Sequence, residues 1–138
     1  MRLEVSTRIG APPERVFATI MDVERWPEWT ASVASVEKVA AGELKIGSKV
    51  RIKQPKVPVV VWTVTVIEPG RAMEWQAKGP GSKTVGWHRV EPEGDGSKAT
   101  LGIEQSGVFF ALMGWYFNGM TRRYVDMELV GLKARCEA

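Results

Sequence analysis

Glu128 interrupts an otherwise apolar helical face near the end of the chain. Placing residues 109–137 at about 100° each puts Glu128 on one line with Tyr124 and Leu132. A carboxylate that faces a dry interior is costly unless it is paired, and burial favours its protonated form. Glu128 is therefore a candidate general acid or base. The plainer alternative is a structural ion pair with Arg135 or another arginine, or a helix end that is open to water.

His88 is the only histidine of the chain, and it shares strand parity with the inward-facing Val90. An imidazole that faces a cavity can accept or donate a proton near neutral pH. The preceding residue, Trp87, has the opposite parity. A bulge in this strand would therefore turn Trp87 inward and His88 outward. An enzyme interpretation would use Glu128, His88 or Tyr124 as acid and base, whereas a lone histidine is more often a hydrogen-bonded cavity or surface residue.

Ten positions that face inward by helical or strand periodicity are candidate ligand-binding residues. Aromatic and methionine side chains form good walls for apolar ligands, and a few polar groups among them would orient a bound molecule. Core packing is the alternative for any single member. The ten are Gln54, Trp62, Met73, Trp75, His88, Gln105, Met113, Phe117, Met120 and Tyr124.

Other kinds of site are not expected. One histidine and one cysteine, Cys136, do not make a usual zinc site or an intrachain disulfide. No serine elbow, P-loop or phosphate-binding glycine-rich helix start occurs. We therefore expect no metal and no cofactor.

Charge and hydropathy point to a cytoplasmic protein that does not bind nucleic acid. The net charge is only +3, and the basic residues are scattered rather than gathered in a stripe. The N-terminus has no apolar signal region, and no stretch approaches the roughly 18 apolar residues that a membrane span needs. With 138 residues, the chain is expected to form a single domain over residues 1–138, as a monomer or homodimer.

Many strands, two short helices and one long helix must position these side chains. Pro12 and Pro13 fit a helix start, and Pro27 ends a second short helix.

The strands are predicted from alternation. Within residues 58–68, strict alternation would place Val66 on the same face as Trp62. Helical periodicity takes over from about residue 109 to residue 137. Strands are predicted at residues 2–9, 33–39, 48–54, 58–68, 71–78, 83–92 and 98–106, joined by short turns that favour an antiparallel meander.

This order of elements resembles the START-like superfamily, whose helix-grip fold is that of the pollen allergens. The resemblance rests on the motif APPERVF at residues 11–17, the turn WPEW at 26–29, and a closing helix that contains Gly-Leu-Lys at 131–133. The sequence RVEP at 89–92, followed by Gly-Asp-Gly at 94–96, is similar to the polyketide cyclase/dehydrase-related branch. The resemblance covers essentially the whole chain.

The resemblance implies an α+β fold in which a curved seven-stranded antiparallel sheet wraps around the long C-terminal helix. Two short helices follow the first strand, and a cavity lies between sheet and helix. It transfers no catalytic residue, because the family has no universal catalytic motif.

Three functions remain open on this basis. The expected one is binding of a hydrophobic or aromatic small molecule, lipid-like or polyketide-like, with residues 107–114 as a candidate gate. The first alternative is a polyketide cyclase/dehydratase-like enzyme. The second is a co-chaperone-like interaction module that uses Leu112, Trp115 and Val130 as its surface.

Overall fold

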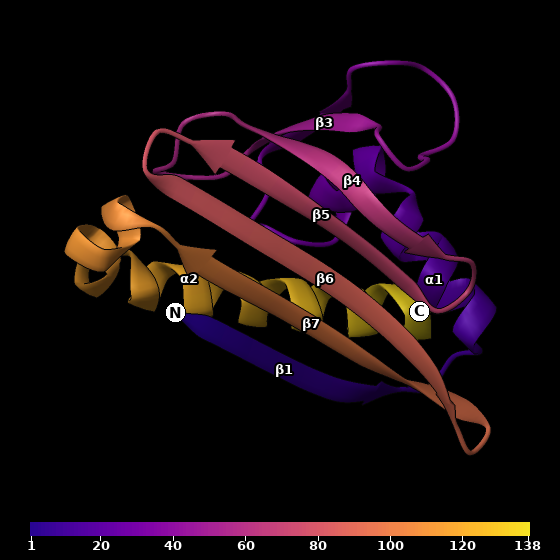
Figure 1. The fold of residues 1–138 in the computed structure, drawn as a ribbon. Helices are drawn as coiled ribbons and strands as arrows, with labels where there is room; N and C mark the ends of the chain where they lie inside the picture. The colour runs from indigo at the N-terminus through magenta and orange to yellow at the C-terminus, as the bar shows by residue number, and fades with distance from the viewer.

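A computed structural model describes all residues from 1 to 138 and shows the helix-grip arrangement that the sequence predicts. Seven strands, two short helical segments and one long helix follow one another along the chain (Figure 1). They are β1 (Arg2–Ile9), α1 (Pro13–Met21), η1 (Val23–Glu28), β2 (Ser35–Lys38), β3 (Lys49–Lys53), β4 (Val60–Glu68), β5 (Ala72–Gly79), β6 (Ser82–Glu93), β7 (Gly96–Ser106) and α2 (Val108–Glu137).

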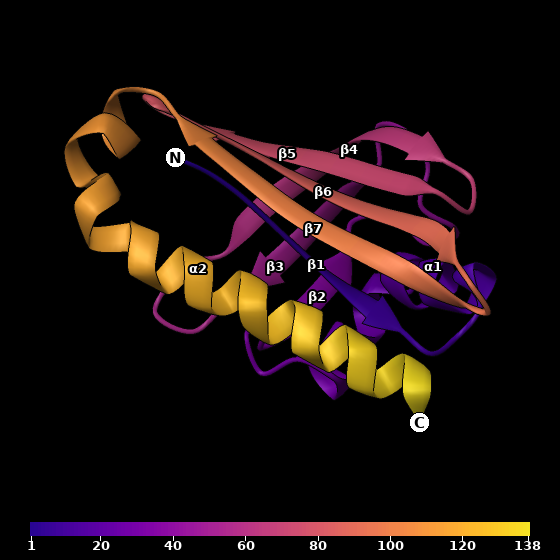
Figure 2. The same ribbon diagram turned by 90° about the horizontal axis from the view of Figure 1, so that it is seen from below.

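The seven strands form one antiparallel sheet in the order β1-β7-β6-β5-β4-β3-β2. Strands β2 to β7 are a meander, and β1 closes the order by pairing with β7. Helix α2 runs beneath the sheet from the end of β7 to the C-terminus, and its first turns curve away from the axis of the rest (Figure 2). Sheet and helix therefore face each other along most of their length.

A β-bulge in β4 overturns the strict alternation expected for that strand. Val64 pairs with Trp75, but the register then shifts, so that Val66 pairs with Glu74 and Ile67 pairs with Met73. The extra residue, Thr65, reverses the parity of the rest of the strand, because two residues on the bulged strand oppose one on its partner. The expectation that Val66 faces inward was therefore wrong, and Ile67 packs against the core instead.

The WPEW turn is packed tightly against the C-terminal helix. Trp26 is buried and donates its indole N–H to the Ile20 carbonyl oxygen at 3.0 Å, which joins η1 to α1. A Cβ atom at Gly131 would lie 2.0 Å from the Trp29 carbonyl oxygen, so only glycine allows this approach. The WPEW turn and the Gly-Leu-Lys sequence at 131–133, two motifs on which the family resemblance rests, thus contact each other. None of the helices is long and apolar enough to cross a membrane.

Candidate functional site

The inner face of the sheet and α2 enclose a cavity of about 620 Å³. Ligand pockets in proteins commonly measure roughly 300–1,000 Å³. The walls are mostly apolar, since 19 of the 31 lining residues are hydrophobic. The space is therefore of the size and character that suits a small apolar molecule.

One end of the cavity is open and the other is closed. The lining residues that are also exposed belong to residues 58–61, to the end of β5 and to the start of α2. At the opposite end the lining consists of buried side chains, among them Trp26, His88 and Val125. A ligand would enter beside the first turns of α2 and reach toward the WPEW turn.

Eight of the ten candidate ligand-binding residues line this cavity, and two do not. Met73 is completely buried in the core, where its carbonyl oxygen faces His88. Met113 belongs to the first turns of α2 and lies half-buried outside the cavity. The eight that line it are Gln54, Trp62, Trp75, His88, Gln105, Phe117, Met120 and Tyr124.

His88 and Glu128 meet at the closed end, His88 from β6 and Glu128 from α2. The Nε2 atom of His88 lies 3.1 Å from Oε1 of Glu128, and the two side chains are 6% and 17% exposed. On the other side of the ring, Nδ1 lies 3.2 Å from the Met73 carbonyl oxygen. A carbonyl only accepts, so Nδ1 carries a proton. Nε2 is within hydrogen-bond reach of the Glu128 carboxyl group, and an imidazole in contact with a carboxyl group is a potential acid and base.

Arg135, named as one possible ion-pair partner of Glu128, does not contact it. The Arg135 guanidinium instead lies 2.8 Å from a carboxylate oxygen of Glu28, on the outside of the molecule. Residue 135 lies seven residues after residue 128, which is about 10 Å further along the helix axis. Its side chain therefore pairs beyond the closed end of the cavity, and the partner of Glu128 is His88 rather than an arginine.

Aromatic rings hold the imidazole in place. Trp26 and Trp75 stand edge-on to His88, with ring centroids 5.4 and 5.5 Å away. Gly86 makes room for this arrangement, because a Cβ atom there would lie 3.0 Å from the Trp75 indole nitrogen. The dyad therefore sits in a fixed orientation, and pre-organisation of this kind is what proton transfer requires.

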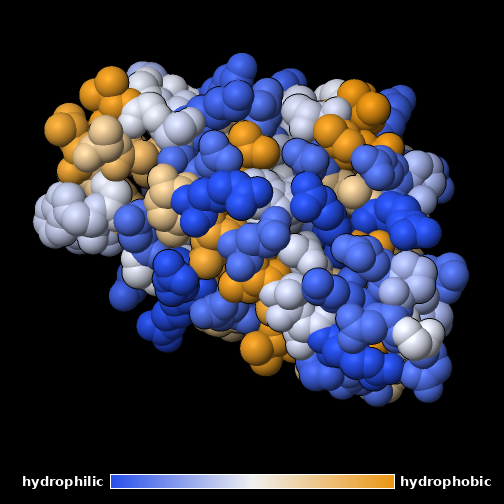
Figure 3. All heavy atoms as spheres, turned by 60° about the horizontal axis from the view of Figure 1, so that its bottom comes forward, coloured by the Kyte–Doolittle hydropathy of each residue, from blue (hydrophilic) through white to orange (hydrophobic).

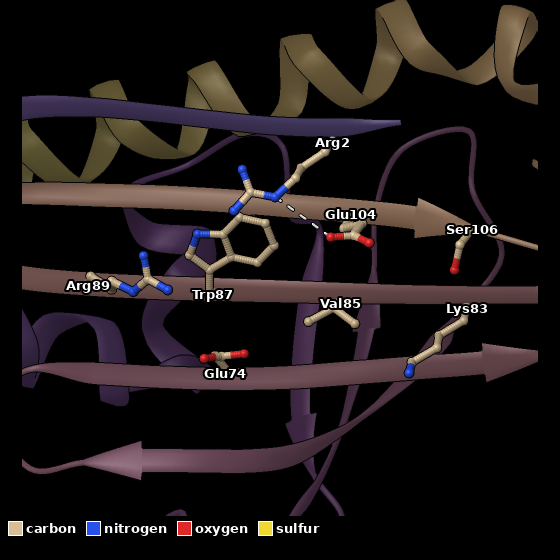
Figure 4. A pocket seen from close by; sticks show the side chains of 8 residues that line it. All are labelled: Arg2, Glu74, Lys83, Val85, Trp87, Arg89, Glu104 and Ser106. Carbon is tan, nitrogen blue, oxygen red and sulfur yellow. Dashed lines mark ion pairs between the residues drawn. The ribbon is translucent and has the colours of Figure 1, made fainter.

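The outer face of the sheet explains why His88 points inward. Trp87 lies flat over Gly102, where any Cβ atom would be 2.0 Å from its ring. Its indole N–H donates to Glu4 at 2.8 Å, and the Arg2 guanidinium stacks 4.9 Å from the ring centroid. Figure 4 shows Trp87 on this face between Arg2 and Arg89. Two successive large rings thus face opposite sides of a regular strand, and no bulge occurs in β6.

The groove around Trp87 has few free charges with which to bind a ligand. Its volume is about 250 Å³, and charged side chains of both signs line it (Figure 4). Arg2 pairs with Glu104 at 3.7 Å, and Arg89 pairs with Glu4 at 3.7 Å. These charges compensate one another, so the inner cavity is the better candidate site.

Gln105 and Thr121 form a second polar point, midway along the cavity. The Gln105 amide donates to the Thr121 hydroxyl oxygen at 3.2 Å. The amide oxygen of Gln105, Oε1, is buried and has no hydrogen-bond partner. An unpaired buried acceptor is costly, and it is a place where a ligand donor would bind favourably. Helical spacing places Thr121 on the inner face of α2, but spacing within one helix carries no information about its contact with Gln105.

Tyr124 has a structural partner. Its hydroxyl donates to the carbonyl oxygen of Pro55, in the loop between β3 and β4. This bond fixes the loop 54–59 against α2 and brings Val57, Pro58 and Val59 to the cavity wall. The loop residues carried no sequence signal for the site, because their place depends on this long-range contact. The same bond occupies the phenol proton that an acid role for Tyr124 would need.

Two titratable groups with shifted pKa values lie away from the cavity. Burial raises the pKa of the Cys136 thiol above its ordinary value of 9.0. The Gly10 backbone N–H, and after it the Lys133 ammonium, lower the pKa of the exposed Glu137 carboxyl group below 4.5. Cys136 contacts Thr19 in the second half of α1, and Glu137 accepts from Gly10 in the connection between β1 and α1, so both tie the last turn of α2 to this part of the chain. They are part of the scaffold rather than of the site.

Known proteins share this architecture over its whole length. TTHA0849 from Thermus thermophilus is 21% identical with a TM-score of 0.79, covering 99% of this chain and 97% of that one. A START superfamily protein from Mycobacterium smegmatis is 15% identical, with a TM-score of 0.75 and coverage of 99% and 97%. At these identities the likeness concerns the fold alone.

A third solved structure is a two-domain protein. The chain matches half of the di-domain ARO/CYC StfQ from the steffimycin biosynthetic pathway, at 13% identity and a TM-score of 0.79 over 99% of this chain. A sequence search among curated proteins found no match. The family model described as polyketide cyclase/dehydrase and lipid transport matches residues 1–137. The chain therefore belongs to this polyketide cyclase/dehydrase and lipid-transport family.

Proposed function

We propose that the protein binds a hydrophobic or aromatic small molecule, lipid-like or polyketide-like, in the cavity between the sheet and α2. The single observation that carries the proposal is the cavity of about 620 Å³, with aromatic walls and polar groups at two separate points. Apolar walls supply affinity, and sparse polar groups fix orientation. The proposal keeps the expected cytoplasmic location and the expected monomer or homodimer.

The two polar points define the chemistry of the ligand. Thr121 and Glu128 are seven residues apart on α2, which corresponds to about 10 Å along the helix axis. The free Gln105 acceptor favours a hydroxyl or N–H donor at one point, and the His88–Glu128 pair favours a carbonyl or hydroxyl oxygen at the other. A phenolic polycycle with oxygens at both ends meets both requirements, and a simple alkane meets neither.

Displacement of a fluorescent apolar probe, 1-anilinonaphthalene-8-sulfonate, tests the proposal. A panel of hydroxylated polycycles and fatty acids would be titrated against the probe–protein complex. Ala77 lines the cavity, so Ala77→Phe should reduce probe affinity at least tenfold by filling the space. Ala134→Phe places the same ring on the exposed side of α2 and should change nothing. Equal probe binding by both variants would contradict the proposal.

A second candidate function is acid–base catalysis on such a ligand, and the His88–Glu128 contact favours it. The dyad would remove a proton beside a ligand carbonyl and return it to an oxygen, as a cyclisation or dehydration requires. With a hydroxylated polyketide-like substrate, His88→Ala and Glu128→Gln should abolish turnover while leaving binding within a few-fold. If both variants leave turnover and ligand affinity unchanged, the enzyme interpretation is rejected and the binding function remains.

A further inference from the structure

The first turns of α2 expose an unusual apolar surface beside the cavity mouth. Leu112 is 68% exposed and Trp115 is 78% exposed. No charged residue occurs between positions 107 and 121. We call the exposed set the apolar tip; its members are Val108, Phe109, Leu112, Trp115 and Tyr116. Figure 3 shows orange and pale side chains gathered at the left end of the molecule, over this part of α2.

The apolar tip is held in place rather than hanging free. Gly107 has a φ of 101° and packs so tightly that a Cβ atom would lie 2.4 Å from the Gly81 carbonyl oxygen. That same oxygen accepts the Phe109 backbone N–H at 2.8 Å. Phe109 contacts Phe110 and Phe117, which both line the cavity. The tip is therefore a fixed rim of the cavity mouth, and residues 107–114, expected to act as a gate, are anchored at their first glycine.

Free basic side chains surround the same end of the molecule. Lys56, Lys78 and Lys83 are exposed, and none of them forms an ion pair, whereas the arginines at the far end pair with nearby carboxylates. No acidic residue occurs in residues 44–67, 75–90 or 105–125. The acidic side chain nearest in sequence to the tip, Glu104, is paired with Arg2. The cavity mouth thus combines an uncharged aromatic rim with uncompensated positive charge.

We propose that this end docks onto the surface of an anionic lipid membrane. Trp and Tyr side chains favour the boundary between headgroups and acyl chains, and nearby lysines are attracted to anionic headgroups. A second copy of this chain is a poorer occupant, because symmetric contact of two tips would bring the unpaired lysines of both copies together. The expected interaction surface of Leu112, Trp115 and Val130 is not one patch. Val130 lies 15 residues beyond Trp115, about 22 Å along an ideal helix.

The inference goes beyond ligand binding, and its test needs no ligand. Purified full-length protein would be floated with vesicles of phosphatidylcholine alone, and with vesicles that also contain phosphatidylglycerol. We expect binding to the anionic vesicles that weakens as salt is raised, because headgroup attraction is screened. Leu112→Ser with Trp115→Ser should weaken it at least tenfold. Val130→Ser, at an equally exposed site on the same helix, should have no effect.

A charge series makes the result decisive. Lys78→Glu with Lys83→Glu should abolish the preference for anionic vesicles, whereas Lys98→Glu, on an exposed lysine toward the opposite end of the sheet, should not. Circular dichroism would confirm that all variants are folded. Absence of flotation with anionic vesicles would overturn the proposal. So would equal binding by the tip variant and the Val130→Ser control, or light scattering that shows a dimer of the wild type and a monomer of the tip variant.

Discussion

Replacing Glu128 by leucine should destabilise the protein by leaving His88 without its partner. The His88 side chain is only 6% exposed, so its Nε2 atom would find little water after the change. An unsatisfied buried polar group costs about 1–3 kcal/mol. Glu128 itself is 17% exposed, and relief of its own partial desolvation offsets part of this loss. We therefore expect a net decrease in the free energy of unfolding of about 1–2 kcal/mol.

Glu128→Gln is the matched variant. Its amide N–H can donate to Nε2 of a neutral imidazole whose Nδ1 proton remains bound to the Met73 carbonyl oxygen. The hydrogen bond is thus kept while the carboxyl group is lost, and we expect less than about 1 kcal/mol of change. Asp126→Leu serves as a control, because Asp126 is exposed on the same helix and forms no ion pair.

Urea denaturation at pH 7, followed by circular dichroism, measures all three variants. Thermal scans should agree, with a shift of roughly 3–4 °C for each kcal/mol in a domain of this size. If Glu128→Leu is as stable as the wild type, the dyad is not formed in solution. If Glu128→Gln is as damaging as Glu128→Leu, the carboxylate charge, rather than a hydrogen-bond partner for His88, is what stabilises the closed end.

Three further predictions concern the scaffold. Gly102→Ala should destabilise the protein by about 1–3 kcal/mol in chemical denaturation, because the new methyl group must displace the Trp87 ring, and an unchanged midpoint would contradict the packing. Tyr124→Phe should raise hydrogen exchange in residues 54–59 by releasing the loop from α2; equal protection would show that the bond is dispensable. Glu137 has a lowered pKa in the folded protein, so its contribution to stability is present above pH 4.5 and is lost as the pH falls below that value. Glu137→Gln should reduce the dependence of stability on pH in this range, and an unaltered profile from pH 5 to pH 2 would refute the assignment.

Local pattern was enough to predict most of the helices and strands and their antiparallel order. Alternation and turn residues located the strands, and a period of 3.6 placed Phe117, Tyr124 and Glu128 on one face of α2. These features depend on residues close in sequence, and each can be read without knowing the tertiary structure. The resemblance to the START-like superfamily added the packing of the curved sheet around the long helix.

The details of the site depend on contacts that local pattern does not contain. His88 and Glu128 are 40 residues apart, and Tyr124 binds a carbonyl 69 residues away. The bulge that turns Val66 outward changes parity within one strand. The position of Met113 depends on the curvature of a helix start that is held by Gly107. Each is set by tertiary packing, which overrides simple periodicity.

Native mass spectrometry of the protein purified from its own host tests the central claim most directly. We predict that a fraction of the 15.3 kDa chain carries a non-covalent small molecule of a few hundred daltons, with oxygens that suit the two polar points of the cavity. The same preparation of Ala77→Phe should lack it, and Ala134→Phe should retain it. If the wild type never carries a small molecule, even after incubation with the probe and the polycycle panel, or if Ala77→Phe carries the same adduct, the cavity is not the binding site.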